Sequence, residues 1–421
     1  MKIFKNKKRK YIIISGLVST FVVTGLIITY YNSIPKEEPL IGAYINGTYS
    51  ETLLSKGSGY AVEKIVCDNN KNASWDYNKW GIKLSNWGTR SRCNIYFKSL
   101  ESFTIANKTF YLDEAQRCPA MNSDGTVTVT GLEDTYGYLC KAKDAYGDSY
   151  YYRGNVTNNY VLFAGKYWRI IRYNGDGTIR VIYDGTSAHA NDDESADRQI
   201  GTSSFNRNHN DNAGVGYMYG KDGASTYAET HANTNNSTIK TYLDTWYENN
   251  IKGTSNEQYV KDNLFCNDRS LSSNMPSGYS NKGYGTEKTA YRWDNFADNS
   301  NNNKMMLTCP QKNDAFTVND TSNGNGALTY GVGLVTTDEV VLSGGWSLSN
   351  SNYYLHSGNV YWTMSPMYFN GNDANGSLVG SGGAATNHFY VFSIRGARPV
   401  LNLSPEVLKN GDGTASNPYH T

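Results

Sequence analysis

Residues 167–185, YWRIIRYNGDGTIRVIYDG, have the pattern of a β-hairpin. Aromatic and β-branched residues fill both halves, and the NGDG run at 174–177 between them has the composition of a tight turn. Another strand-like run, YVLF at 160–163, comes just before this hairpin. We therefore expect a β-meander near the start of a main domain that spans residues 150–421.

Helices are expected at only two places in this main domain. Residues 237–251 repeat apolar side chains at helical spacing, with Ser237 or Thr238 as the N-cap. The TTDE run at 336–339 has the pattern of a capping box and opens a short helix. Residues 191–236 have little periodicity and are expected to form a loop, while the remainder alternates between strand and turn patterns. These features predict the α+β class, with irregular antiparallel sheets and two helices.

Three smaller segments are expected before the main domain. Residues 52–101 carry short alternating runs separated by turns, which predicts a small β-sandwich that acts as a spacer. Residues 102–149 are expected to form a connector that is cross-linked by a disulfide. Residues 32–51, which hold two prolines, are expected to form a stalk.

The first 31 residues have the features of a membrane signal anchor. Residues 11–31 contain no charge and, at 1.5 Å per residue, would span about 30 Å as a transmembrane helix. The basic residues 1–10 are expected to stay cytoplasmic. A cleaved signal peptide is the alternative, although no small-x-small site follows the apolar stretch. We expect a single-pass protein of the cell membrane, with the lipid bilayer as a partner through residues 11–31 and the C-terminal ectodomain extracellular.

Six cysteines, all beyond residue 31, predict structural disulfides. An even number of cysteines fits an oxidising compartment, and the absence of a Cys-x-x-Cys pair argues against a metal site. Six cysteines allow 15 connectivities, so the sequence leaves the pairing open. We expect neighbours in the sequence to pair: Cys67 with Cys93, Cys118 with Cys140, and Cys266 with Cys309.

Composition argues against binding of nucleic acid. The chain has 39 Lys and Arg residues against 38 Asp and Glu, and six of the basic residues lie in positions 1–10. The remainder is therefore net acidic and has no basic face to neutralise a phosphate backbone. Tyr, Asn, Ser and Gly are abundant, as in antibody paratopes, where Tyr gives rigid contact area and Asn and Ser give adaptable hydrogen bonds.

Aromatic residues of the C-terminal loops are the candidate ligand-binding residues. Aromatic faces pack against the C–H faces of sugars, and Asn amides bond their hydroxyls. The candidates are Trp346, Tyr353, Tyr354, Tyr361, Trp362 and Tyr368. The alternative is that they form core, because Tyr361 and Trp362 sit in a strand-like run. We expect a non-catalytic binding or adhesion protein that recognises a glycan or a surface protein. An enzyme acting on wall or host polymers and a structural surface protein without a ligand are the other hypotheses.

Motifs assign no catalytic residue and no cofactor. The sequence has no HExxH, Gly-x-Ser-x-Gly, P-loop or dinucleotide pattern. Residues 191–197 concentrate four carboxylates that are candidate ligands for Ca²⁺: Asp192, Asp193, Glu194 and Asp197. Because they lack the spaced pattern of a calcium loop, a solvated loop is the simpler interpretation.

Several motifs that follow one another along residues 150–421 carry a family resemblance. They are YWRIIRYNGDGTIRVIYDG (167–185), STIKTYLDTWYENNI (237–251), FCNDRS (265–270), GLVTTDEVVLSGG (333–345), YWTMSP (361–366) and GARPVLNLSPEVLKNGDGTASNPY (396–419). This region resembles a family of uncharacterised bacterial cell-surface domains, which are similar to the fold shared by C-type lectins and sulfatase-modifying factors. The resemblance implies an α+β domain whose first and last strands lie side by side.

Two departures limit what this resemblance implies about activity. Sulfatase-modifying factors depend on a cysteine pair near the end of the domain, whereas the last cysteine here is Cys309. The Glu-Pro-Asn and Gln-Pro-Asp motifs of calcium-dependent lectins are also absent. The resemblance therefore supports neither activity, and leaves sugar binding by aromatic stacking as the expectation.

Overall fold

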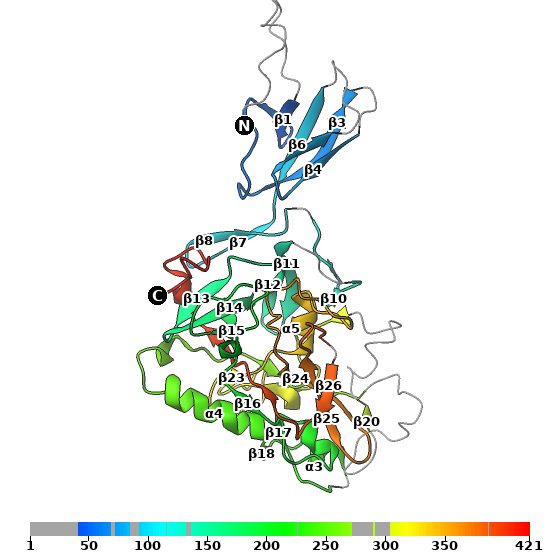
Figure 1. Cartoon of the computed structure of the whole chain (residues 1–421), viewed down its shortest axis with the longest axis vertical. Coiled ribbons are helices and arrows are strands. Elements are labelled where there is room, and N and C mark those ends of the chain that lie inside the picture. The colour runs from blue at the N-terminus through cyan, green and yellow to red at the C-terminus, as the bar shows by residue number, and fades with distance from the viewer. Residues whose placement is uncertain are drawn as a thin grey trace, which may run out of the picture. The chain divides into compact units, whose positions relative to one another are not determined.

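Two compact units make up the chain, Met1–Ser99 and Leu100–Thr421 (Figure 1). The computed structural model describes residues 41–68, 72–84, 92–114, 116–131, 136–224, 226–271, 289–290, 304–385 and 387–421. Strands account for 38% of the residues and helices for 12%.

The predicted α+β class is wrong, because the protein is mostly β-sheet. The described residues contain three α-helices, α3 (Tyr227–Thr230), α4 (Thr238–Asn250) and α5 (Thr337–Leu342). Both helices predicted from the sequence are present as α4 and α5, and α3 lies in the stretch expected to be loop. Only α4 exceeds two turns, since the other apolar runs are short, lie between turn residues and bury their side chains by pairing as strands.

The transmembrane helix predicted at 11–31 falls outside the described residues. In the part of the chain that the structure describes, no helix has the length and apolar character needed to cross a membrane.

The first unit pairs its strands into two small sheets. Its strands are β1 (Ile41–Ile45), β2 (Thr48–Ser50), β3 (Tyr60–Cys67), β4 (Ala73–Asp76), β5 (Gly81–Leu84) and β6 (Cys93–Ser99). The four-stranded sheet has the order β2-β1-β6-β3, and β4 and β5 form a hairpin. Strands β1 and β2 belong to this sheet, so residues 41–50 are not the stalk that the sequence predicted.

A very small hydrophobic core holds the first unit together. Ala43, Ile95 and Phe97 are its buried apolar residues, and Trp75 packs edge-on against Phe97 with ring centroids 5.8 Å apart. A core of this size stabilises a unit only weakly, so a covalent link contributes a large share. That link is Cys67–Cys93, which joins paired positions of β3 and β6.

The disulfide pattern follows the prediction in full. Cys67–Cys93, Cys118–Cys140 and Cys266–Cys309 are all bonded, with sequence separations of 26, 22 and 43 residues. Each bond links cysteines that neighbour one another in the sequence.

Replacing Cys67 and Cys93 together by serine is expected to unfold the first unit selectively. Closing a loop of this length contributes about 3 kcal/mol, which is comparable with the stability of so small a core. Limited proteolysis of the full chain should then cut within residues 41–99 and leave residues 136–224 intact. The matched control is the single exposed substitution Tyr49→Ser on β2. Equal protease resistance of the double variant and the control would show that the disulfide is not needed.

The second unit begins with a hairpin and contains most of the described strands. Its early strands are β7 (Ser102–Ile105), β8 (Lys108–Tyr111), β9 (Ala120–Met121), β10 (Val127–Thr128), β11 (Gly137–Asp144), β12 (Gly147–Gly154), β13 (Tyr160–Phe163), β14 (Lys166–Tyr173), β15 (Ile179–Gly185), β16 (Thr202–Ser203), β17 (Met218–Tyr219) and β18 (Asn235–Asn236). Its later strands are β19 (Phe265–Cys266), β20 (Thr289–Ala290), β21 (Lys304–Met305), β22 (Ala315–Phe316), β23 (Val332–Gly333), β24 (Tyr361–Phe369), β25 (Ala374–Val379), β26 (Asn387–Tyr390), β27 (Arg395–Gly396) and β28 (Val400–Leu403). Short 3₁₀-helices are η2 (Ala196–Arg198), η3 (Asn212–Val215), η4 (Glu257–Tyr259), η6 (Lys312–Asp314) and η7 (Pro405–Leu408).

The predicted meander is confirmed as β13, β14 and β15. In the turn between β14 and β15, Asp176 accepts hydrogen bonds from the backbone and hydroxyl of Thr178, and Gly177 has φ of +82°. These strands lie in a sheet of order β11-β12-β14-β15-β28-β23, with β13 paired to β14. Strand β28 pairs with β15, and Tyr419 bridges to Val161, so the end of the chain lies beside the meander.

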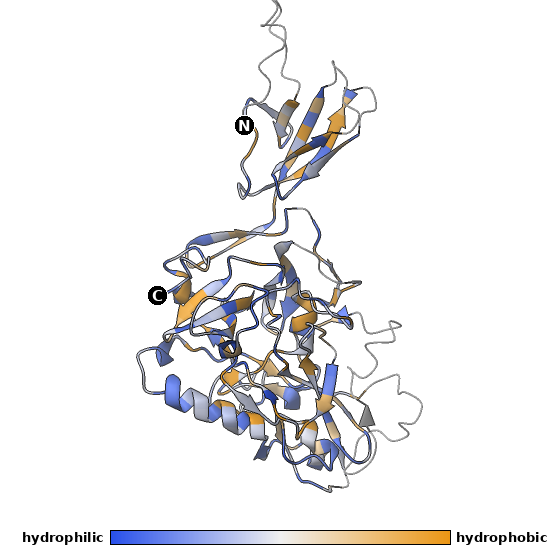
Figure 2. Ribbon diagram, viewed as in Figure 1, coloured by the Kyte–Doolittle hydropathy of each residue, from blue (hydrophilic) through white to orange (hydrophobic). Residues whose placement is uncertain are grey.

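A second sheet has the order β16-β27-β24-β25-β26, which leaves β26 at an edge. Helix α4 shows mainly hydrophilic residues on its visible side in Figure 2. Its residues Ile239, Leu243 and Tyr247 are buried in the main core. The amphipathic pattern of 237–251 therefore anchors the helix through one apolar face.

Candidate functional site

Five of the six aromatic residues predicted to bind a ligand are buried. Trp346 is 8% exposed, and the other four are fully buried: Tyr353, Tyr354, Tyr361 and Trp362. Their polar atoms are bonded internally, as shown by the Trp362 indole, which donates to the carbonyl of Ser203. The prediction of a binding surface built from these residues is therefore wrong, and the core alternative holds. Tyr368 alone is half-buried, and its hydroxyl lies 3.1 Å from Nε2 of His388.

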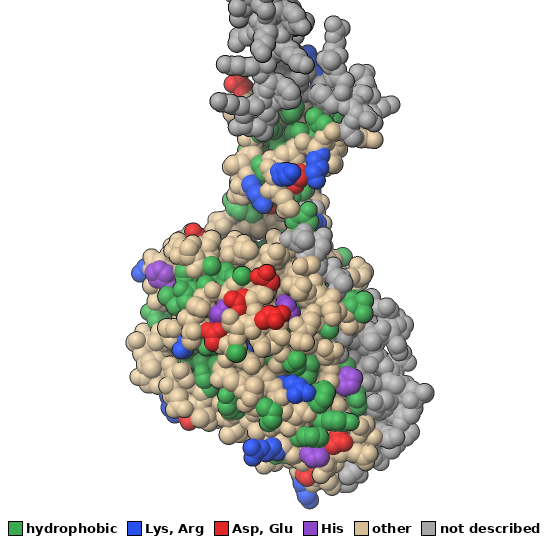
Figure 3. Space-filling view, viewed as in Figure 1, with side chains coloured by type: hydrophobic (Ala, Val, Ile, Leu, Met, Phe, Trp, Pro, Cys, Tyr) green, Lys and Arg blue, Asp and Glu red, His purple; other side chains and the backbone are tan. Residues whose placement is uncertain are grey.

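The acidic loop at 191–197 is built around a histidine. His189 lies between two carboxylates, with Nδ1 3.1 Å from Asp193 and Nε2 2.9 Å from Asp197. Hydrogen bonds from Ser195 and His189 lower the pKa of Asp193 to about 2. Acidic and histidine side chains gather on one face of the second unit in Figure 3.

The described residues contain no group of three or more His, Cys, Asp or Glu side chains that could hold a metal ion. Asp192 and Glu194, the other two predicted calcium ligands, are therefore not brought into such a group with Asp193 and Asp197. Two of the four predicted ligands instead pair with His189.

A polar groove lies in the second unit, beside the start of α4. It has a volume of about 590 Å³ and is formed by the first turns of α4, the segment that begins with β16, parts of β17 and β18, and Ile394. Its described lining consists of seven Ser or Thr residues, three Asn, two Tyr, Arg207 and Ile394. This set is Thr202, Ser203, Ser204, Asn206, Arg207, Asn208, Tyr219, Asn236, Ser237, Thr238, Thr241, Tyr242, Thr245 and Ile394.

Local hydrogen bonds fix the walls of this groove. Ser237 caps α4 by accepting from the backbone N–H of Lys240, and Thr238 accepts from the backbone N–H of Arg207. The backbone N–H of Ile239 donates to the carbonyl of Phe205 at 2.9 Å. The start of α4 is thus tied to the segment that begins with β16, and the two walls are held together.

One side-chain donor in the groove wall lacks a partner. Asn206 is 2% exposed, and its amide nitrogen has no hydrogen-bond partner in the part of the chain that the structure describes. An unpaired buried donor costs free energy in the native state, and this nitrogen is enclosed by protein rather than open to the groove.

The groove lining supplies mainly uncharged hydrogen-bonding groups, together with one positive charge. Among its described lining residues, Arg207 is the only ionised side chain and no carboxylate occurs. The two-carboxylate hydrolysis of glycosidic bonds therefore has no reacting groups in this lining. Hydroxyls and amides, which both donate and accept, match the hydroxyl groups of an uncharged polar ligand.

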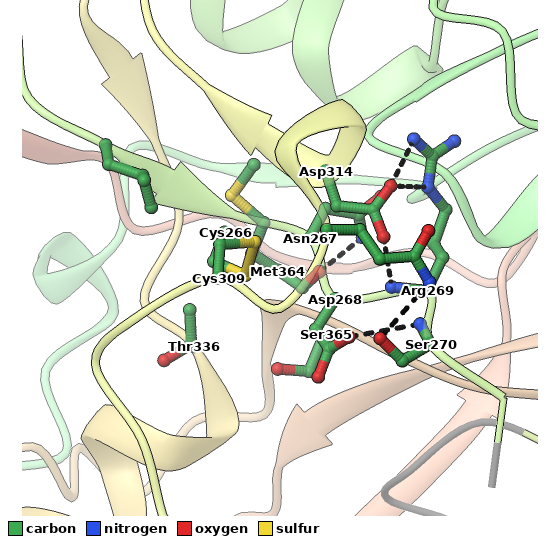
Figure 4. The surroundings of a disulfide bond; sticks show 12 residues. Cys266, Asn267, Asp268, Arg269, Ser270, Cys309, Asp314, Thr336, Met364 and Ser365 are labelled. Atoms are coloured by element: carbon green, nitrogen blue, oxygen red, sulfur yellow. Dashed lines mark hydrogen bonds and ion pairs between the residues drawn. A yellow bond between two sulfur atoms is a disulfide. The ribbon is translucent and has the colours of Figure 1, made fainter. Parts of the chain in front are cut away.

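A second cavity lies beside the Cys266–Cys309 disulfide but is far smaller. Its volume is about 20 Å³, and its lining includes Arg172, Arg180 and Glu339. Figure 4 shows the disulfide with the ion pair of Arg269 and Asp314 on one side and Thr336 on the other in this view. A space of this size holds a water molecule and is too small for a larger ligand.

Comparison with known proteins yields no relative. No family model matches the chain, and neither curated proteins nor solved structures give a significant match. The family resemblance suggested by the sequence motifs therefore gains no support.

Sequence reasoning missed the groove because its residues come from separate segments. Most of them lie in 202–208, within the predicted loop, and in 236–245, mostly within the predicted helix. Ile394 lies far along the chain from both. The abundance of Ser, Thr and Asn in 202–208 was the available signal, but it does not distinguish a binding groove from a solvated loop.

Proposed function

We propose that this protein is a non-catalytic, extracytoplasmic protein that binds a neutral glycan in the polar groove. The observation that carries the proposal is a groove lined mostly by hydroxyl and amide side chains. Tyr219 and Tyr242 add aromatic surface, which packs against the C–H faces of sugar rings. Three disulfides support a location outside the cytoplasm, where such bonds persist.

The proposal is tested with the full chain, purified with its disulfides formed and kept in mild detergent. Its binding is measured against a panel of neutral and acidic polysaccharides, with and without a chelator. We expect saturable binding to a neutral polysaccharide, because hydroxyls and amides make up most of the lining. The chelator should leave this binding unchanged, because the described lining holds no carboxylate to bind a metal ion. Binding to acidic polymers alone, or to none of the panel, would overturn the proposal.

Filling the groove with a large side chain is expected to abolish this binding. Thr245 is exposed and lines the groove, so Thr245→Trp should lower affinity at least tenfold by occupying space the ligand needs. Isothermal titration calorimetry with the best polysaccharide measures the effect. The matched control is Asn249→Trp, one turn further along α4, exposed and outside the groove lining. Equal affinity of the two variants would place the ligand elsewhere.

A further inference from the structure

Three exposed aromatic rings follow one another at the edge of the second sheet. Phe389, Tyr390 and Phe392 are 43%, 40% and 42% exposed. The rings of Tyr390 and Phe392 stack with centroids 5.4 Å apart and planes 3° apart, and Phe389 meets Tyr390 edge-on at 5.8 Å. Val391 between them is fully buried, and Phe392 lies in the turn that follows β26. We call Phe389, Tyr390 and Phe392 the ring row.

The position of the ring row makes its exposure unusual. Strand β26, which carries Phe389 and Tyr390, is the last strand in its sheet. Exposed aromatic residues on an edge strand invite unwanted pairing, so proteins usually cover them or place charges there. Hydrophobic side chains gather over the region of β25 and β26 in Figure 3. A contiguous apolar surface of this kind marks a site of interaction.

Two chain segments join the ring row to the polar groove. Ile394, which is 57% exposed, lines the groove two residues after Phe392. His209 directly follows the groove residues Arg207 and Asn208, and its ring centroid lies 4.6 Å from that of Phe392. Asp373 holds this histidine in place, with Oδ1 2.8 Å from Nδ1. The ring row therefore lies close to the groove, two residues before Ile394 and in contact with His209, the residue that follows Asn208.

We propose that the ring row extends the groove into a longer site for a linear, neutral polysaccharide. This inference rests on the proposed function and adds the ligand class, a chain too long for the groove alone. Hydroxyl and amide groups of the groove would bond one part of the chain. The aromatic rings would pack against the C–H faces of sugars further along, a contact that needs no charge and depends on ring surface. The occupant is a glycan rather than a protein because the groove beside the ring row is lined mostly by hydroxyl and amide groups, with Arg207 as its one ionised side chain among the described residues.

The test uses the full chain and series of cello-, chito- and manno-oligosaccharides, from disaccharide to octasaccharide. Affinity should rise with chain length and then level off once the ring row is reached. The double variant Tyr390→Ala/Phe392→Ala should bind the shortest ligands within about twofold of the unmodified chain. It should lose about tenfold in affinity for the longest, or about 1.4 kcal/mol, because both ring contacts with the sugar chain are removed. The matched control is Tyr111→Ala, which removes a tyrosine of the second unit that is also 40% exposed.

The outcomes separate this inference from the proposed function. If short ligands bind but affinity neither rises with length nor depends on the two rings, the groove binds glycan and the extended site is wrong. If no oligosaccharide of any length binds, the proposed function fails and the extended site fails with it. The double variant could instead change the sedimentation coefficient of the protein and leave its affinity for long oligosaccharides unchanged. The ring row would then be a contact between copies of the protein, and the extended site would again be wrong.

Discussion

Replacing Asp184 by asparagine is expected to lower the free energy of unfolding of the second unit by about 3–5 kcal/mol, enough to unfold a marginally stable protein. This carboxylate is fully buried and is shared by three arginines. Its Oδ1 accepts from Nη2 of Arg198 at 2.8 Å and from Nη2 of Arg398 at 3.0 Å. Its Oδ2 lies 3.9 Å from Nη1 of Arg169.

The large effect follows from the charges that remain. Asparagine is nearly isosteric, so Asp184→Asn changes the packing little while it leaves three buried guanidinium groups without their shared counter-ion. Burial already lowers the pKa of Arg169 and Arg398, which shows that the site disfavours their charged forms. Thermal unfolding followed by near-UV circular dichroism measures the loss. The control is Asp148→Asn, which removes an ion pair with Lys141 at a half-exposed position and should cost at most about 1 kcal/mol. Equal effects of the two substitutions would contradict the argument.

Local sequence patterns were sufficient for the β13–β15 meander and for the caps of α4 and α5, but not for β16, β17 and β18, which lie in the stretch expected to be loop. The β14–β15 hairpin could be predicted because its turn residues reverse the direction of the chain. Helix α4 could be predicted because Ser237 marks its start and a regular apolar stripe follows. The capping box at Thr336 and Glu339 is present with both reciprocal hydrogen bonds. The predicted α+β class is wrong because a pattern that identifies two helices does not show what share of the chain they occupy. Strands account for 38% of the residues and helices for only 12%.

Composition could not separate core from surface. Tyrosine packs well in an interior when its hydroxyl finds a partner, as Tyr353 does with the carbonyl of Gly383. A sequence rich in tyrosine therefore looks like a binding surface even where it builds a core. The exposed rings of Phe389 and Tyr390 follow the same local pattern as the buried ones, and only the position of β26 at the sheet edge distinguishes them. That position depends on pairing between distant strands, which local sequence does not encode.

Acid is expected to destabilise the second unit through His231. Burial lowers the pKa of this histidine to about 3, and the neighbouring Arg269 acts in the same direction. In the folded protein the neutral ring lies 2.9 Å from the carbonyl of Tyr227 through Nδ1, and its ring centroid is 3.9 Å from that of Tyr227. The unfolded chain takes up a proton near the ordinary value of 6.5, so between about pH 6.5 and pH 3 it binds more protons than the folded protein. Stability must therefore fall as pH falls through this window, with a contribution of about 1.4 kcal/mol per pH unit.

His231→Asn isolates this contribution from that of the carboxylates. The asparagine amide can replace Nδ1–H as a donor to Tyr227 but cannot gain a proton in this range. The variant should therefore lose less stability than the unmodified chain between pH 6.5 and pH 3, as measured by urea unfolding at a series of pH values. Asp314, whose pKa burial raises, faces Arg269 and is present in both proteins, so its titration cancels in the difference. His420→Asn serves as the control, because that histidine lies near the chain end outside the core, and it should leave the slope unchanged. Parallel pH profiles for His231→Asn and the unmodified chain would mean that His231 takes up its proton in the folded state, against the burial argument.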